Sequence, residues 1–262
     1  MKTFSQNFGD FKDKRVLITG ASKGLGWVCS QELDRQGARL VCSGRNKEKL
    51  DELKASFQNR DNHLVFSGDL VNPKVIRELV SKTETYFGGI DIVLHVLGGG
   101  YGFRDPLLTW EQLDILHKVN IGAAAEINRL VVPGMVEQKS GNLVHVGSIA
   151  SAEATGSVGY NTIKASLAGY VRSLGRELAP SGVVVTGVLP GAFYAPGNSW
   201  RRLEENKPEV VKKFIEDNLP RNKIAEPEEV VPLILFLASE AASMMSGSCV
   251  PIDAGEGKAY IS

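Results

Sequence analysis

Short apolar runs alternate along this chain with longer segments of helical length, and this alternation constrains the fold more than any other feature. The runs cover residues 15–20, 38–43, 63–67, 91–97, 142–147, 183–189 and 249–252. They are apolar throughout, which is typical of strands buried on both faces of a parallel sheet. The segments between them are long enough for crossover helices, at residues 24–36, 47–58, 72–87, 109–138, 156–179 and 227–240. The pattern predicts an α/β fold with a doubly wound parallel sheet of the Rossmann type.

We expect one domain over residues 1–262, because the sequence contains no linker, internal repeat or low-complexity tract and this length suits one large domain. The fourth helical segment contains Pro133. Proline inside a helix removes a hydrogen bond and clashes with the preceding turn, so we expect a bend or a break there.

An insertion at residues 191–224 interrupts the alternation after the sixth predicted strand. Ligands bind at the carboxyl ends of the strands in sheets of this kind, and the insertion begins there. It carries Phe193, Tyr194 and Trp200, which favour a mobile substrate lid, since a purely solvated loop rarely holds three aromatic residues. The alternative is a solvated surface excursion.

Charge and cysteine content exclude several classes of protein. The 30 basic and 30 acidic side chains cancel, which argues against a dedicated nucleic-acid binder. Cys29, Cys42 and Cys249 are far apart and form no CxxC motif. We interpret them as buried thiols in a reducing compartment rather than as disulfides or a zinc site. No other grouping of His, Cys, Asp and Glu has the spacing of a metal site.

Neither a secretory signal nor a membrane span is visible in the sequence. Residues 1–15 are polar and lack the apolar stretch of a signal peptide. The longest apolar run, residues 230–238, is too short to span a bilayer. We therefore expect a cytoplasmic protein without a membrane partner.

Glycines cluster where the first predicted strand meets the first predicted helix. Residues 19–26 read TGASKGLG and place Gly20, Gly24 and Gly26 in a TGxxxGxG pattern. Glycine permits a tight turn and a close backbone approach, and the start of a helix offers N–H groups to a phosphate. The motif predicts a nucleotide pyrophosphate site.

The end of the second predicted strand indicates which nucleotide binds. Gly44 stands where an NAD site needs an acid for the ribose 2′-OH, and Arg45 follows it. Arg45 and Lys23 together suit the 2′-phosphate of NADP, whereas either cation alone is typical of a solvated loop. Asp69, after the third strand, either accepts a hydrogen bond from the adenine amine or caps the next helix.

Tyr160 and Lys164 stand four residues apart in a predicted helix, so they share one face of it. A nearby cation favours the phenolate and lowers a tyrosine pKa from its ordinary value of about 10, which makes proton transfer possible at neutral pH. Ser148 ends the fifth strand and reaches the same pocket. Asn120 lies in the fourth helical segment, facing the sheet, and is otherwise a helix-packing asparagine.

Together these residues resemble the short-chain dehydrogenase/reductase family over about residues 11–253. The resemblance rests on TGASKGLG at 19–26, GDL at 68–70, VN at 119–120, GS at 147–148, YNTIK at 160–164, PG at 190–191 and PIDAG at 251–255. It implies that Tyr160 is the general acid/base and that Ser148 orients the carbonyl oxygen. It also implies that Lys164 lowers the pKa of Tyr160 and binds the nicotinamide ribose, while Asn120 holds a relay water.

The resemblance also implies a set of NADP(H)-binding positions. They are Gly20, Ser22, Lys23, Gly24, Leu25, Gly26, Arg45, Asp69, Leu70, Gly98, Asn120, Tyr160, Lys164, Pro190 and Gly191.

Three positions depart from the family pattern. Residues 95–98 read HVLG in place of the usual NNAG. Ser148 and Tyr160 are 12 residues apart, one fewer than the family spacing. Ala195 stands where the family often has a threonine that contacts the nicotinamide carboxamide.

Two histidines in predicted strands receive separate interpretations. We interpret His145 as a satisfied core residue, whereas His95 either lines the cofactor cleft or packs in the core. A serine hydrolase is excluded because the GxSxG motif is absent.

The sequence therefore predicts an NADP(H)-dependent oxidoreductase that interconverts a ketone and a secondary alcohol. The first substrate hypothesis is a 3-oxoacyl thioester. The alternative is a sugar or another polar metabolite, in a polar aromatic pocket formed by Tyr101, Arg104, Tyr194, Asn198 and Arg201. For either substrate we expect contacts with Tyr101, Tyr194 and Trp200. A catalytically idle NADP-binding regulator is a third hypothesis.

We also expect a homodimer or homotetramer. The segments 109–138 and 156–179 carry more small and apolar residues than one sheet face needs, and in the resembling family these helices pair between subunits.

Overall fold

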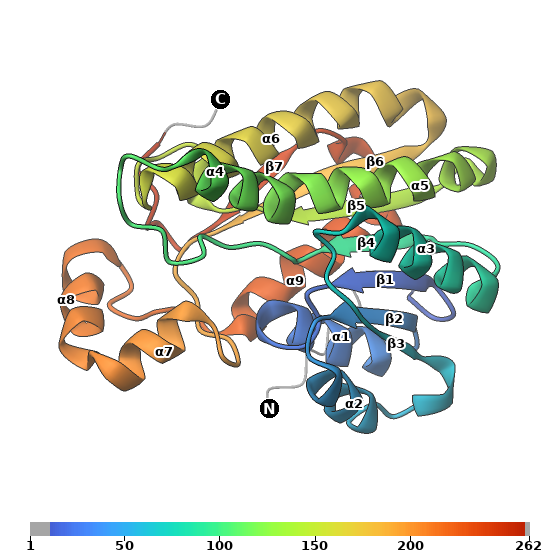
Figure 1. Ribbon diagram of the computed structural model, residues 1–262, viewed down its shortest axis with the longest axis horizontal. Helices are drawn as coiled ribbons and strands as arrows, with labels where there is room; N and C mark the ends of the chain where they lie inside the picture. The colour runs from blue at the N-terminus through green and yellow to red at the C-terminus, as the bar shows by residue number, and fades with distance from the viewer. Residues whose placement is uncertain (1–10, 260–262) are drawn as a thin grey trace.

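The computed structural model describes residues 11–259 and contains one seven-stranded parallel sheet with helices on both faces (Figure 1). The strand order is β3-β2-β1-β4-β5-β6-β7. This arrangement confirms the doubly wound α/β fold. The strands are β1 (Arg15–Thr19), β2 (Arg39–Gly44), β3 (Leu64–Ser67), β4 (Ile92–His95), β5 (Gly141–Val146), β6 (Val183–Pro190) and β7 (Cys249–Ile252).

Nine α-helices surround the sheet within residues 11–259. They are α1 (Gly24–Arg35), α2 (Lys47–Ala55), α3 (Pro73–Phe87), α4 (Trp110–His117), α5 (Ala123–Gln138), α6 (Val158–Leu178), α7 (Ser199–Asn206), α8 (Pro208–Asn218) and α9 (Pro227–Ala238). Short 3₁₀ turns occur at Arg60–Asn62 (η1), Ile149–Ser151 (η3), Ala179–Ser181 (η4) and Glu240–Met245 (η5).

Each face of the sheet has its own apolar core, because successive strand residues point to opposite sides. Val16 and Ile18 of β1 pack with α1, α2 and α9, whereas Leu17 between them packs with α3, α5 and α6. The two cores hold the carboxyl ends of β4, β5 and β6 in fixed register at one edge of the sheet.

The fourth helical segment is irregular at Asn120 rather than at Pro133. A π-helical turn, Lys118–Gly122 (η2), separates α4 from α5, and α5 continues through Pro133 to Gln138. Of the bend or break that we expected at the proline, the break is therefore absent. Single π turns inside helices occur frequently at functional sites, and this one carries Asn120.

The insertion after β6 is more ordered than the sequence indicated. It forms α7 and α8, which project from one side of the sheet (Figure 1). These helices enclose a small apolar core of their own, composed of Ala192, Tyr194, Val211, Leu219 and Ile224 with Trp200, Leu203, Phe214 and Ile215 packed against it. We refer to residues 191–224 as the lid.

No described helix has the length and apolar character needed to cross a membrane. Cys29 and Cys42 are buried free thiols, and burial raises the pKa of both to about 12. The expectation that the chain carries no secretory signal falls largely on residues 1–10, which lie outside the described residues.

Two stacked histidines lie in the core beneath the functional edge of the sheet. His95 in β4 and His145 in β5 are register partners, with ring centroids 4.5 Å apart. Asn128 of α5 joins them: its Oδ1 lies 2.7 Å from Nε2 of His95 and its Nδ2 lies 3.2 Å from Nε2 of His145. His95 is only 4% exposed, so it belongs to the core rather than to a cofactor cleft.

This network fixes both histidines as neutral rings. His95 donates from Nε2 to the Asn128 oxygen, while His145 accepts at Nε2 and has its Nδ1 3.3 Å from the Thr186 carbonyl oxygen. Burial lowers the pKa of His95 to about 4, and burial with the neighbouring His95 ring lowers the pKa of His145 well below its ordinary value.

We expect the unfolding free energy to fall as the pH drops below about 6.5, because unfolded histidines then bind protons that the native core rejects. Each such histidine contributes at most about 1.4 kcal/mol per pH unit. Urea unfolding between pH 7 and 5 should show a shallower pH dependence for His95→Asn than for the wild type. The control is a substitution of His117, an exposed histidine outside this buried network. The account would be contradicted if His95→Asn and the wild type showed the same dependence of the unfolding free energy on pH.

Candidate active site

Ser148 and Tyr160 meet at the carboxyl end of β5. Ser148 follows this strand and Gly147, and Tyr160 lies in the first turn of α6. The Ser148 hydroxyl lies near enough to the Tyr160 hydroxyl to lower the pKa of Tyr160, and the Ser148 oxygen accepts from the backbone N–H of Ala150 at 3.2 Å. The two hydroxyl groups therefore form one polar unit, in spite of the shortened interval between them.

Lys164 lies one helical turn after Tyr160 and is almost completely buried, at 4% exposure. Its ammonium group donates to the carbonyl oxygen of Val146 at 3.1 Å and lies 5.6 Å from the centre of the Tyr160 ring. Burial lowers the pKa of Lys164 to about 8. The carbonyl thus holds the ammonium beside the phenol ring, at the edge of the sheet.

The π turn directs the Asn120 side chain to the loop after β4. Its Nδ2 donates to the carbonyl oxygens of Gly99 and Leu116, both at 3.0 Å, and its Oδ1 accepts from the N–H of Gly99 at 3.0 Å. Asn120 therefore closes a two-point clamp on the Gly99 backbone.

Gly98 lets Asn120 and Lys164 approach each other. A Cβ atom at this position would lie 2.8 Å from Oδ1 of Asn120 and 3.3 Å from Nζ of Lys164. Gly98 is the one position of residues 95–98 that matches the family pattern, and the space it leaves open explains why a glycine stands there. A Cβ on Gly100 would likewise press on the Tyr160 ring at 3.3 Å.

The pKa of Tyr160 differs from the sequence prediction. Burial raises the pKa above its ordinary value, and the Ser148 hydrogen bond offsets only part of this effect. From the sequence we expected Lys164, together with an oxidised nicotinamide, to lower this pKa; among the protein groups alone, desolvation has the larger effect. Tyr160 is a protonated phenol at neutral pH.

The glycine-rich loop has the geometry of a phosphate site. Gly20 has φ of +70°, and a Cβ on Gly26 would lie 2.5 Å from the Gly20 carbonyl oxygen. Among residues 11–259, no acceptor pairs with the N–H groups of Leu25 and Gly26 in the first turn of α1. These two amides are available to an anion.

Two cations predicted to bind the nucleotide lie next to the glycine-rich loop and the end of β2. Lys23 and Arg45 are both exposed, and Arg45 follows β2 directly. The pKa of Lys23 is lowered, first by burial and then by the positive charges of Arg202 and Arg45. Arg202, in α7, is a third member of this group that sequence analysis missed, because no motif links the lid to the glycine-rich loop. Ser22 packs against Gly44, where a Cβ would lie 2.9 Å from its hydroxyl oxygen.

Asp69 does not cap the following helix. Its side chain accepts from the N–H of Val71 at 3.3 Å, and Asn72 is the residue that caps α3. Asp69 is exposed at the end of β3 while Leu70 is buried, so the carboxylate stays accessible to an adenine amine.

The Pro190-Gly191 segment is held by the C-terminal part of the chain. The N–H of Ala192 donates to Glu256 at 2.6 Å, and a Cβ on Gly191 would lie 2.4 Å from the same carboxylate oxygen. Ala195 is buried at 2% exposure and provides no hydroxyl group. Glu256 is a second residue that sequence analysis missed, since it stands 64 positions away.

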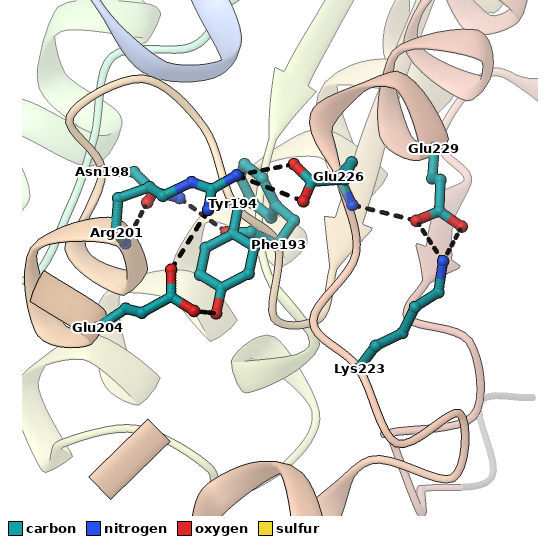
Figure 2. A network of polar contacts seen from close by, with 8 residues as sticks. All are labelled: Phe193, Tyr194, Asn198, Arg201, Glu204, Lys223, Glu226 and Glu229. Atoms are coloured by element: carbon teal, nitrogen blue, oxygen red, sulfur yellow. Dashed lines mark hydrogen bonds and ion pairs between the residues drawn. The ribbon is translucent and has the colours of Figure 1, made fainter. Parts of the chain in front are cut away.

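The polar side chains proposed for a sugar pocket pair with one another inside the lid (Figure 2). The Tyr194 hydroxyl donates to Glu204 at 2.6 Å, and the Arg201 guanidinium covers the Tyr194 ring at 3.9 Å. Arg201 also bonds Glu204 and Glu226, at 3.2 and 3.0 Å. These contacts give Tyr194 and Arg201 a structural role in the lid.

Asn198 and Trp200, the other substrate candidates in the lid, also contact other lid residues. Asn198 caps α7 and donates to the Phe193 carbonyl oxygen at 2.7 Å, and Trp200 packs on Phe214 with ring centroids 4.4 Å apart. Tyr101 and Arg104 differ, because both are exposed in the loop after β4. Of the substrate candidates, these are the two exposed side chains that lie outside the lid.

A cavity of about 480 Å³ lies beside β7 rather than at Tyr160. Ile149, Glu153, Cys249 and Asp253 are among its lining residues. Asn120, Ser148, Tyr160 and Lys164 do not line this cavity. The candidate active site is therefore separate from it.

Comparison with known proteins agrees with this geometry. A family model described as enoyl-(acyl carrier protein) reductase matches residues 20–256. The chain belongs to the short-chain dehydrogenase/reductase family. It is an oxidoreductase, as the sequence resemblance indicated.

Individual relatives cover nearly the whole chain. It is 29% identical over 247 residues to the 3-oxoacyl-[acyl-carrier-protein] reductase FabG of Thermotoga maritima, covering 92% of this chain and 97% of that protein. A 3-oxoacyl (acyl-carrier-protein) reductase of Agrobacterium tumefaciens, solved with NADP bound, matches at 25% identity with a TM-score of 0.86 and covers 95% of each chain. L-sorbose reductase of Gluconobacter frateurii, solved with NADPH and L-sorbose, shares the fold at 24% identity and a TM-score of 0.87, over 96% of this chain and 100% of that one.

We expect Gly98→Ala to destabilise the protein by about 1–3 kcal/mol, because its methyl group overlaps Asn120 and Lys164. Thermal unfolding measures the effect. The matched control is Gly134→Ala in α5, where no atom lies within 4 Å of an added Cβ and alanine favours the helix. If both variants were as stable as the wild type, the close contact at Gly98 would be refuted.

Proposed function

We propose that the protein is an NADP(H)-dependent reductase that converts a ketone to a secondary alcohol, or the reverse. The observation that carries the proposal is the meeting of the Ser148 and Tyr160 hydroxyl groups beside the buried ammonium of Lys164. This pair offers one acidic hydroxyl and one orienting hydroxyl to a carbonyl oxygen.

The residues that would hold NADP(H) fit its chemistry. The free amides of Leu25 and Gly26 suit the pyrophosphate, and Lys23 and Arg45 suit the 2′-phosphate. Gly44 leaves no carboxylate at the position that an NAD site uses. When bound, the nicotinamide supplies or accepts the hydride. The NADP-bound Agrobacterium reductase supports this assignment.

The side chains then handle the proton. Tyr160 is protonated at neutral pH, so it is ready to donate its proton to the carbonyl oxygen while Ser148 holds that oxygen by a hydrogen bond. Lys164 stabilises the phenolate that results, and on the family pattern it also binds the nicotinamide ribose. Asn120 holds the Gly99 loop and, on the same pattern, positions the water that returns a proton to Tyr160.

For the substrate, we favour a 3-oxoacyl thioester over a sugar or another polar ketone. The Thermotoga relative and the Agrobacterium structure carry that activity in their names. The sugar alternative has support from the fold of L-sorbose reductase. However, Tyr194, Asn198 and Arg201 already bond to Glu204, the Phe193 carbonyl oxygen and Glu226, respectively, which reduces what they offer to a sugar.

An idle NADP-binding regulator is the weaker hypothesis, because it has no use for a complete set of Asn120, Ser148, Tyr160 and Lys164.

We further propose that residues 1–262 form one domain, with residues 191–224 as its substrate lid. The buried thiols of Cys29 and Cys42 suit a reducing compartment, and we assign the protein to the cytoplasm.

We also propose a homodimer or homotetramer that pairs through α4, α5 and α6. These helices expose large apolar side chains, among them Trp110 at 82%, Val158 at 51% and Val136 at 40%. Large apolar side chains exposed on neighbouring helices support an interface between copies of the chain.

We expect Tyr160→Phe to lower kcat about 10²- to 10⁴-fold with NADPH affinity nearly unchanged, because it removes only the proton carrier. Lys164→Ala should lower both turnover and NADPH affinity, since the ammonium serves the phenol and the ribose together. The assay is NADPH oxidation with 3-oxoacyl thioesters and polar ketones, combined with fluorescence titration of NADPH. Near-native turnover of Tyr160→Phe on the best substrate would refute the catalytic assignment.

We expect Arg45→Ala to weaken NADPH binding about 10-fold or more and to leave NADH binding unchanged, because its partner is the 2′-phosphate. Calorimetric titration with each nucleotide measures both affinities. If the wild type bound NADH as tightly as NADPH, the assignment of NADP would fail.

Sedimentation velocity at micromolar concentration should show a dimer or tetramer. Trp110→Ser and Val158→Ser together should shift the distribution towards the monomer. A monomeric wild type would contradict the proposed assembly.

A further inference from the structure

The lid is bonded to the glycine-rich loop where α1 begins. The N–H of Gly24 donates to the Pro196 carbonyl oxygen at 2.8 Å. The next lid residue, Gly197, has φ of +65°, and a Cβ built on it would lie 3.9 Å from Cδ of Lys23. The tip of the lid loop therefore lies directly against the Lys23 side chain.

Arg202 extends this contact from α7. Its guanidinium donates to the Gly197 carbonyl oxygen, which places it at the same loop tip. Its neighbour Arg201 takes part in the lid's own packing with Tyr194 and Glu226. Successive helix residues differ by about 100° in direction, so Arg202 does not share the partners of Arg201 and instead contacts Gly197, which lies against Lys23.

Three positive charges thus gather between the lid and the end of β2. Burial lowers the pKa of Lys23, and the positive charges of Arg202 and Arg45 lower it further. Within residues 11–259, no carboxylate forms an ion pair with Lys23, Arg45 or Arg202. Like charges repel one another, so an anion among them stabilises the group.

We infer that Arg202 binds the 2′-phosphate of NADP(H) together with Lys23 and Arg45, so that this phosphate ties the lid down over the cofactor. The inference rests on the proposed use of NADP(H), and it adds a specificity residue from the substrate lid. The 2′-substituent of the adenosine ribose lies at the end of β2 in doubly wound folds, which is where Arg45 stands. The guanidinium fork of Arg202 suits two oxygens of one phosphate.

This arrangement links cofactor choice to substrate access. NADP(H) offers the phosphate that Arg202 needs, whereas NAD(H) leaves the lid without this contact. The phosphorylated cofactor therefore orders α7 before a substrate binds, and the non-phosphorylated one does not.

The first test compares Arg202→Gln with the wild type in calorimetric titrations. We expect a roughly 10-fold loss of affinity for both NADPH and 2′,5′-ADP, and no change for NADH or 5′-ADP, since a lost charge-assisted hydrogen bond is worth about a factor of ten. The matched control is Lys213→Gln, which removes an exposed lid charge in α8 and should change none of the four affinities. Inorganic phosphate, as a competitor, distinguishes a general anion site from recognition of the nucleotide.

Two outcomes would overturn the inference. Unchanged affinity of Arg202→Gln for 2′,5′-ADP would show that the guanidinium does not contact the phosphate. An equal loss for NADPH and NADH would place the contact elsewhere on the nucleotide. Both differ from failure of the proposed cofactor, in which the wild type itself shows no preference for NADPH and Arg45→Ala has no effect.

The second test measures the lid itself by hydrogen exchange with mass spectrometry. In the wild type, 2′,5′-ADP should slow amide exchange in residues 199–206, and 5′-ADP should not. Arg202→Gln should abolish the difference. The ligand lacks a nicotinamide, so the protection reports the phosphate contact alone; equal protection by both nucleotides would contradict the inference.

Discussion

A buried ammonium group, that of Lys164, determines the geometry of the functional edge of the sheet. A charge taken out of water is unfavourable unless it is hydrogen-bonded, and the carbonyl oxygen of Val146 provides that bond at 3.1 Å. The contact ties α6 to the end of β5, which places Tyr160 one turn away against Ser148. Gly98 has no side chain to obstruct the ammonium, and Asn120 holds the adjacent Gly99 loop.

Desolvation then decides which protonation states the two groups adopt. Burial raises the pKa of Tyr160 and lowers that of Lys164, so both groups shift towards their neutral forms. A protonated phenol is the form that a reductase needs for donating a proton. The reverse reaction needs the phenolate, which the positive charge of an oxidised nicotinamide favours. At neutral pH the raised pKa of Tyr160 therefore favours proton donation, in keeping with the proposed reduction.

The sequence was sufficient for the features that follow from local spacing. Apolar runs predicted the parallel sheet, and the positions of Tyr160, Lys164 and the glycines predicted which residues meet at its edge. Features that depend on contacts between distant segments were not predictable. The π turn at Asn120, the Val146 partner of Lys164 and the link between His95 and His145 through Asn128 leave no motif. Burial of Tyr160 likewise reversed the expected direction of its pKa.

The lid shows the same limit in a different way. Its aromatic and charged residues suggested a substrate pocket, yet Tyr194, Arg201 and Glu204 satisfy one another in a small core. A sequence shows that such groups are present but not which of them pair. Arg202 is also an arginine and follows Arg201 directly, but its guanidinium contacts Gly197 whereas that of Arg201 pairs with Glu204 and Glu226.

Single turnover with NADPH deuterated at nicotinamide C4 tests the central claim most directly. The account predicts that wild-type protein transfers deuterium to the carbinol carbon of a reduced ketone, with the hydroxyl proton taken from solvent through Tyr160. Tyr160→Phe should bind the same deuterated NADPH but transfer the deuterium at least about 100-fold more slowly, because it lacks the general acid. Transfer at the wild-type rate by this variant would contradict the account.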